Sequence, residues 1–136
     1  MTAKDLYPDF QGSLFCITDY DPIVKSFGTV AVKVDDDDYH GDSRILYDNA
    51  GKIGYLQFGW GSCSGCDALQ ACETYEAVDE LIEELRGQIR WFDDARDALD
   101  FFKTHDWGGD YNAGRAEQRE FIQKSIDYLE EQTNEN

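Results

Sequence analysis

The chain has 136 residues, 41% of them hydrophobic and 14% aromatic, and its 29 acidic residues against 12 basic ones give a formal net charge of −17. This length and apolar content favour one folded domain and argue against a globally disordered chain. The negative charge argues against direct binding to nucleic acid or to an anionic membrane. Because the sequence has neither an apolar signal segment nor a run of roughly 20 apolar residues that could span a bilayer, we expect a cytoplasmic protein with reduced thiols.

The first half of the sequence is typical of β-strands. Alternating or β-branched segments predict strands at 29–34, 43–47 and 52–58, and residues 13–18 predict a further strand or buried segment. The Asp-Asn-Ala-Gly sequence at 48–51 supplies turn residues, so the two strands beside it should form a hairpin. Residues 19–22 have the chemistry of another turn.

An acidic connection follows the first of these strands. Asp36, Asp38 and Asp42 have spacings found in calcium-binding loops, and Gly41 stands where such a loop turns sharply. However, Tyr47 occupies the position of the bidentate glutamate, and the flanking segments predict strands. We therefore interpret this connection as a solvated acidic loop.

The second half of the sequence is typical of helices. A helix should begin at an N-cap at Thr74 and end near Gly87, because apolar residues recur at i, i+3, i+4 and i+7 between them. These apolar residues are Val78, Leu81, Ile82 and Leu85. A short strand is expected at 88–92, a second helix capped by Asp93, and a third helix at about 115–131.

This order of elements predicts an α+β fold. An antiparallel sheet of about three to five strands from the first half should be packed on one face by about three helices from the second half. Residues 1–131 should form a single domain, and residues 132–136 a frayed acidic tail.

Three of the four cysteines follow the predicted hairpin closely. Cys63 and Cys66 have the C-x-x-C spacing that can share a metal, form a disulfide or perform redox chemistry. With Cys72 they supply three candidate ligands, so the expected cofactor is either none or one zinc. The fourth ligand of a closed zinc site would be Cys16, His40 or His105.

The same cysteines also fit two other interpretations. Cys66, Leu69 and Cys72 could share one face of a short helix as small buried side chains, with Phe58 and Trp60 packed against it. A thioredoxin-like redox site is less favoured because the βαβ context is missing.

The sequence gives weak support to an enzyme. It has no nucleophile-elbow motif, no P-loop and no dinucleotide-binding fingerprint, and we assign no catalytic residue. His105, beside Asp106 and Trp107, could act as a general base, but such a histidine more often caps the helix that precedes it.

The helices predicted between residues 73 and 100 carry many carboxylates and only Arg86, Arg90 and Arg96 as cations. Carboxylates at i, i+3 and i+4 lie about 5–6 Å apart, a spacing similar to that of phosphates in a nucleic acid. Such a surface could occupy a basic nucleic-acid channel. The candidate partner-binding residues are Glu76, Asp79, Glu80, Glu83, Glu84, Asp93, Asp94, Asp97 and Asp100.

The cysteine segment also carries a resemblance. Its F-G-W-G-S-C-S-G-C-D-x-L-x-x-C block, together with the upstream Gly41-Asp42 and the acidic helix that follows, resembles a group of small acidic proteins from bacteriophages and their bacterial hosts. The resemblance covers roughly residues 41–105 and implies a phage or mobile-element setting, without an established activity.

These observations lead to two hypotheses. The first is a non-enzymatic, phage-type acidic protein that binds a basic host protein, such as a nuclease, and inhibits host defence as a nucleic-acid mimic, in the manner of anti-CRISPR or anti-restriction proteins. The alternative is a small zinc-binding or thiol module built on Cys63, Cys66 and Cys72.

Overall fold

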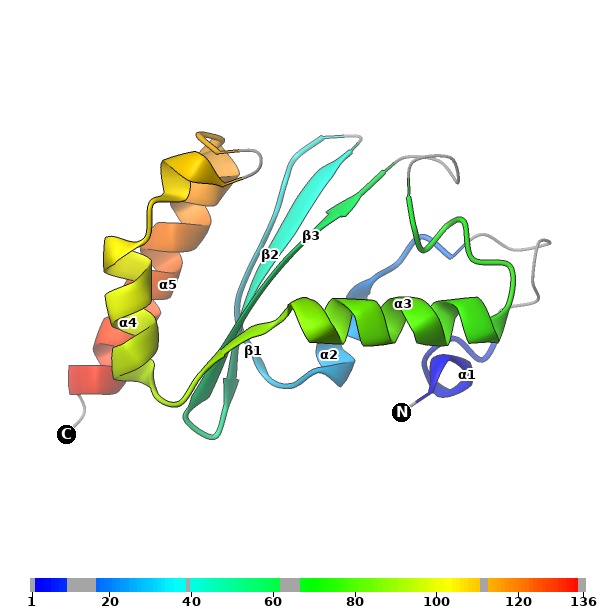
Figure 1. Cartoon of the computed structure of the whole chain (residues 1–136), viewed down its shortest axis with the longest axis horizontal. Coiled ribbons are helices and arrows are strands. Elements are labelled where there is room, and N and C mark those ends of the chain that lie inside the picture. Colours follow the sequence, from blue (N-terminus) through cyan, green and yellow to red (C-terminus); the bar gives the residue numbers. More distant parts are fainter. Residues whose placement is uncertain (1, 10–16, 39, 62–66, 111–112, 135–136) are drawn as a thin grey trace.

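A computed structural model describes residues 2–9, 17–38, 40–61, 67–110 and 113–134 and shows one antiparallel sheet flanked by helices (Figure 1). The strands are β1 (Val30–Asp35), β2 (Gly41–Asn49), β3 (Lys52–Trp60) and β4 (Arg90–Phe92), in the spatial order β1-β2-β3-β4. The helices are α1 (Ala3–Leu6), α2 (Asp21–Ser26), α3 (Tyr75–Gln88), α4 (Ala95–Thr104) and α5 (Ala116–Asn134), and the 3-10 turn η2 (Trp107–Gly109) lies between the last two. The predicted α+β fold is confirmed.

The predicted hairpin is formed by β2 and β3. Its turn residues Ala50 and Gly51 have φ angles of 55° and 98°, which a two-residue turn of this kind requires. The Asp48 carboxylate accepts a hydrogen bond from the Gly51 N–H at 2.8 Å, and Asp48 pairs with Ile53 across the strands. The local turn sequence therefore sets the register of the longest strand pair.

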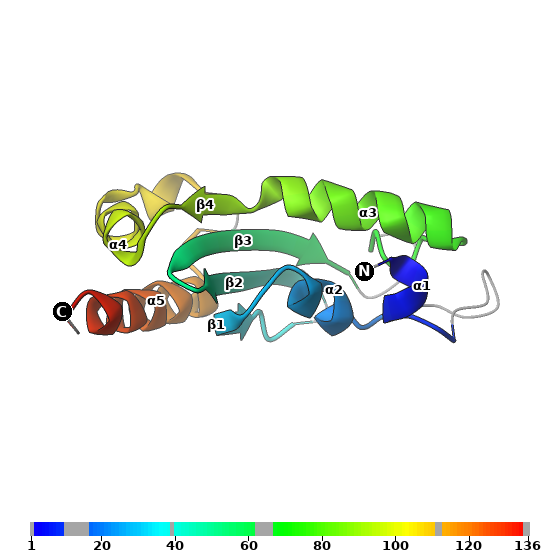
Figure 2. The same cartoon turned by 90° about the horizontal axis from the view of Figure 1, so that it is seen from below.

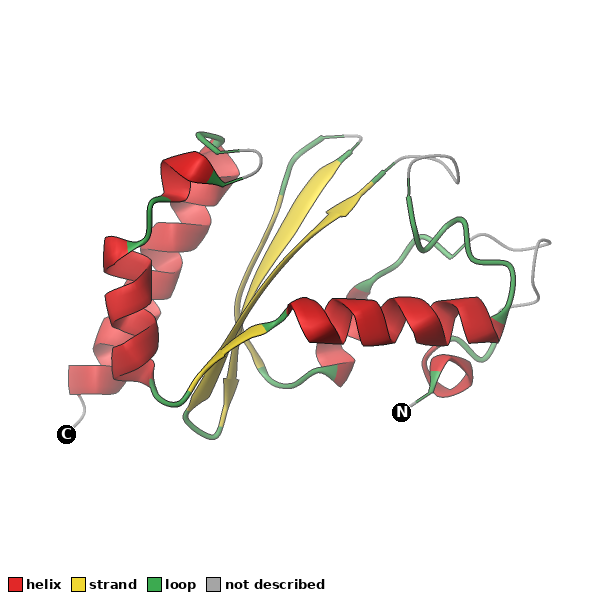
Figure 3. Cartoon of the chain, viewed as in Figure 1, coloured by secondary structure: helices red, strands yellow, loops and turns green. Residues whose placement is uncertain are grey.

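Helices cover both faces of the sheet, whereas the sequence predicted cover on one face only (Figures 1 and 3). Neighbouring side chains on a strand point to opposite faces, and both Ile45 and Leu46 of β2 are fully buried. A central strand buried on both sides needs a layer on each side. Ile45 belongs to a core with α1, α2 and α3, and Leu46 to a core with α4 and α5. Figure 2 shows the same two groups of helices from below.

β4 covers only part of the edge of β3. It pairs with residues 53–55, while β3 continues to Trp60. A Cβ at Gly54 would lie 2.7 Å from Cζ3 of Trp91, so the missing side chain lets the Trp91 ring pack across β3. Beyond Tyr55, no described strand adjoins this edge of β3.

The long helices begin and end close to their predicted positions. Thr74 caps α3 as predicted, and α3 ends at Gln88, one residue beyond Gly87. α5 continues to Asn134, so residues 132–134 of the predicted tail extend this helix. None of the helices in the described ranges combines the length and apolarity needed to cross a bilayer.

Other boundaries differ from the predictions. α1 and α2 are not among the helices that the sequence predicts. α2 includes Pro22, which is favoured in a first helical turn, whereas residues 19–22 predict a simple turn. The N-cap of α4 is Asp94, whose carboxylate accepts the Asp97 N–H at 2.9 Å, so the prediction of Asp93 was wrong by one residue. The candidate strand at 13–18 lies largely outside the described residues.

Candidate functional site

The outer face of α3 carries exposed carboxylates. Glu76, Glu80, Glu83 and Glu84 are all exposed, while the apolar residues of this helix are buried against the sheet. Glu83 forms an ion pair with Arg86 one turn later. Within the described part of the chain, the other three glutamates have no ion pair or hydrogen bond from their side chains. The helix therefore presents negative charge that the described residues do not neutralise.

Two of the candidate partner-binding residues have structural contacts. Asp79 is half-buried and accepts a hydrogen bond from the Ala3 N–H of α1 at 2.7 Å. Asp94 is the N-cap of α4. Asp79 joins α3 to α1 and Asp94 caps α4, so the removal of either carboxylate would affect stability as well as binding.

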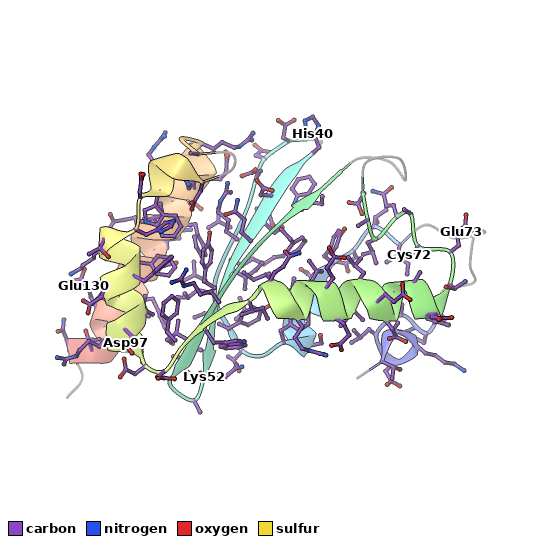
Figure 4. All side chains as sticks on the ribbon, in the orientation of Figure 1. His40, Lys52, Cys72, Glu73, Asp97 and Glu130 are labelled. Carbon is purple, nitrogen blue, oxygen red and sulfur yellow. The ribbon has the colours of Figure 1, made fainter. Side chains whose placement is uncertain are left out.

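The remaining candidates, Asp93, Asp97 and Asp100, are exposed around α4. Because α3 and α4 cover opposite faces of the sheet, their acidic surfaces are separate and do not form one continuous row. Figure 4 shows Glu73, just before α3, and Asp97 toward opposite ends of the molecule. Among the arginines of this region, Arg86 lies in the last turn of α3, Arg90 begins β4, and Arg96 lies at the start of α4.

Only one of the three predicted metal ligands can be placed. Cys63 and Cys66 lie outside the described residues, and Cys72 is a half-buried free thiol. Its Sγ lies 3.3 Å from the Ala68 carbonyl oxygen, to which it donates. Burial, and then the negative charge of Asp67, raise the pKa of the Cys72 thiol. Cys72 is therefore disfavoured as a reactive thiolate, although metal binding would itself promote deprotonation.

The carboxylate of Asp67, the residue after Cys66, binds several backbone N–H groups. It is buried and accepts hydrogen bonds from the backbone N–H of Gly61 at 2.8 Å, of Leu69 at 2.9 Å and of Gln70 at 3.1 Å, and from the Tyr20 hydroxyl at 2.9 Å. The described residues on either side of Cys63 and Cys66 are thus tied together. Residues 68–71 form a hydrogen-bonded turn instead of the predicted short helix.

The histidines considered as a fourth zinc ligand are separated from Cys72. His105 stacks on Phe101, which packs with the α4–α5 core, whereas Cys72 packs on the core of the opposite sheet face. Figure 4 shows His40 at the β1–β2 end of the sheet, away from Cys72. Among the described residues, no group of three histidine, cysteine or carboxylate side chains could hold a metal ion.

The acidic connection between β1 and β2 packs around the buried guanidinium group of Arg44. Asp36 and Asp42 are buried, so the expectation of a solvated loop was wrong for these two residues. Nη1 of the fully buried Arg44 lies 2.7 Å from Oδ1 of Asp36, and its Nη2 lies 3.9 Å from Oδ2 of Asp42. Nε of Arg115 approaches Oδ2 of Asp36 at 3.3 Å from the other side.

A cavity of about 600 Å³ lies at the uncovered edge of β3. The sheet, the α3–β4 connection and the segment after α4 each form one side of it. It is lined by Asp42, Tyr55, Gln57, Phe58, Gly59, Gln88, Arg90, Phe101, His105 and Asp110.

His105 is held firmly in this cavity. It is the C-cap of α4, which is the role that the sequence favoured over that of a general base. Its backbone N–H donates to the Phe101 carbonyl at 2.8 Å. Its Nε2 lies 3.0 Å from both carboxylate oxygens of Asp110, and its ring stacks on Phe101 with centroids 4.6 Å apart. The ring is therefore fixed from two sides.

Polar groups continue from the cavity into the core. The Tyr55 hydroxyl donates to Oε1 of Gln57 at 2.8 Å, and Nε2 of Gln57 lies 3.5 Å from Oδ2 of Asp42. Burial, and then the charge of Asp110, raise the pKa of Tyr55, so this phenol stays protonated. Sequence reasoning did not bring these residues together, although a glutamine within the apolar run of β3 was a signal that the strand faces a polar site.

The structure thus defines a small α+β protein with two separate acidic helix surfaces and a polar cavity at one sheet edge. No protein-family model, no curated protein and no solved structure matches this chain.

Proposed function

We propose that this chain is a non-enzymatic, phage-type acidic protein that binds a basic host protein in the host cytoplasm, in place of a nucleic acid, and so inhibits host defence. The observation that supports the proposal most directly is the exposed face of α3, where Glu76, Glu80 and Glu84 follow one another at i, i+4 spacing without an ion pair among the described residues. The net charge of −17 adds a long-range field of the same sign.

The row of like-charged glutamates on α3 lowers the stability of this helix in the isolated protein. Like charges at i, i+4 destabilise a helix by about 0.2–0.5 kcal/mol per pair. The buried apolar face of α3 offsets this cost, since Val78, Leu81 and Ile82 anchor the helix on the sheet. A basic partner would turn the repulsion into attraction, and the carboxylates would follow a groove that normally holds phosphates.

The test compares two triple variants. The first, Glu76→Gln/Glu80→Gln/Glu84→Gln, neutralises the α3 face, and the second, Glu120→Gln/Asp127→Asn/Glu131→Gln, removes the same charge from exposed positions of α5. A partner captured from bacterial lysate by the unmodified chain is purified, and its affinity for each protein is measured over a range of salt concentrations. Duplex DNA is then added as a competitor.

We expect the α3 variant to bind about tenfold more weakly at low salt, since three exposed charge contacts of about 0.5 kcal/mol sum to this factor, whereas the α5 variant should bind normally. Binding of the unmodified chain should weaken steeply with salt and compete with DNA. Salt-independent affinity, or simultaneous binding of DNA and this protein, would contradict the mimic mechanism.

A second candidate is a zinc or thiol module on Cys63, Cys66 and Cys72. It is supported by the Asp67 carboxylate, which ties Gly61 to the turn that leads to Cys72. About one zinc per chain, lost together with thermal stability in Cys63→Ser and Cys66→Ser, would support it, because structural zinc contributes directly to folding. Metal-free protein with unchanged melting of both variants would remove this candidate.

A further inference from the structure

The cavity at the edge of β3 contains the cation Arg90, for which the described residues supply no counter-ion. The guanidinium of Arg90 stacks on Phe101 at 4.4 Å from the ring centroid and also approaches the Phe92 ring. Within the described ranges its side chain has no hydrogen bond and no ion pair, in a protein with a large excess of carboxylates. Stacking holds the planar group in place and leaves its N–H edges able to bind a carboxylate in two-point fashion.

Two carboxylates line the same cavity from other elements. Asp42 comes from β2, where it is buried beside Gly59, and its Oδ2 lies 3.9 Å from Nη2 of Arg44 and 3.5 Å from Nε2 of Gln57. Asp110 follows η2 and accepts from His105 alone among the described side chains, although a carboxylate can accept about four hydrogen bonds. Arg44 thus faces the charge of Asp42, whereas the Asp110 carboxylate has spare acceptor capacity for a ligand.

This charge pattern discriminates between ligand classes. A simple anion would meet Arg90 but also Asp110, within a strongly acidic protein. A simple cation would meet Asp110 and leave Arg90 unpaired beside it. A ligand with both charges can satisfy both groups, and the remaining lining of aromatic rings and amides is suited to a side chain of mixed polarity.

We propose that this cavity binds a small zwitterion of the α-amino acid class, with its carboxylate on Arg90 and its ammonium group toward Asp110. The volume of about 600 Å³ leaves room for the side chain as well as the charged backbone groups. This site is distinct from the acidic face of α3, so it is independent of the proposed function.

The experiment titrates the full chain with each common L-amino acid and follows backbone amide signals by NMR. For the tightest ligand, the methyl ester removes the carboxylate charge, and the N-acetyl derivative removes the ammonium charge. Arg90→Gln is compared with Arg96→Gln, an equal charge change at an exposed position of α4 outside this cavity. Asp110→Asn provides a second cavity variant, and the melting temperature of each variant is measured to check folding.

We expect the parent amino acid to shift signals around the cavity. The ester and the N-acetyl derivative should each bind about tenfold or more weakly than the parent amino acid, because each lacks one charge-assisted contact. The parent should bind to Arg90→Gln and to Asp110→Asn with a similar loss. Its binding to Arg96→Gln should be normal. No binding by any amino acid at millimolar concentration would overturn the proposal. An ester that binds as tightly as its parent would instead identify a cation site, and an equally tight N-acetyl derivative an anion site; either result would also overturn it.

Discussion

Arg44 is the side chain that most strongly constrains its surroundings. It is fully buried on the central strand, and Asp36 supplies a carboxylate 2.7 Å away. Asp36 also accepts the Asp42 N–H at 2.8 Å, so it closes the β1–β2 connection and is the nearer of the two carboxylates that face the arginine. Charges removed from water must be paired, and a buried arginine cannot escape by losing its proton.

We predict that Asp36→Asn lowers the free energy of unfolding by about 3 kcal/mol, because it leaves the charge of Arg44 poorly compensated in the core. Asp37→Asn is the matched control: the neighbouring side chain is exposed, and its change should stay within about 0.5 kcal/mol. Urea denaturation followed by circular dichroism measures both. Equal effects of the two substitutions would mean that the Asp36–Arg44 pair is not what stabilises this connection.

At the scale of the elements, two adjacent exposed aspartates at the start of α4 have different roles. Asp94 has extended backbone angles and caps the helix through the Asp97 N–H, while Asp93 lies one residue too early. An N-cap side chain satisfies a backbone donor that the helix itself leaves free.

Asp94→Ala should therefore destabilise the protein by about 1 kcal/mol, and Asp93→Ala should change its stability by less than about 0.5 kcal/mol. Both substitutions remove one negative charge, so the relief of general repulsion is the same in each. Thermal melts of the two variants beside the unmodified chain measure the difference. A larger loss for Asp93→Ala would place the cap at the position that the sequence alone predicted.

For the whole molecule, the two cores bury tyrosines from several elements. Burial raises the pKa of Tyr20, Tyr47 and Tyr55, since a phenolate would lose its hydration in the core. In the unfolded chain these phenols titrate near pH 10. Their contribution to stability is therefore complete below about pH 10 and is lost as the pH rises from there toward the raised pKa values.

We predict that alkaline unfolding and ionisation of the buried tyrosines occur together. Phenolate absorbance should rise in two stages, with exposed tyrosines first and the buried ones only as the circular dichroism signal is lost. In concentrated urea all eight tyrosines should titrate near pH 10. Complete ionisation with an intact dichroism spectrum would show that these phenols reach water in the folded protein.

The sequence by itself determined the elements whose signals are local. The turn at 48–51 sets the β2–β3 hairpin, and the spacing of Val78, Leu81 and Ile82 defines the buried face of α3. Both signals act between residues that are neighbours in the chain, through turn geometry and helix periodicity. The acidic composition also follows from the sequence alone.

Only the tertiary structure decided which faces and charges meet. Helices on both faces of the sheet, the capture of Arg44 by an acidic connection and the cavity at β3 all depend on contacts between distant segments. Asp42, Arg90 and Asp110 line one cavity because β4 begins only opposite Tyr55 of β3 and α4 packs on the opposite face from α3. Side-chain periodicity identifies which face of an element is buried but not which element packs against that face. The packing partner depends on contacts between distant segments of the chain.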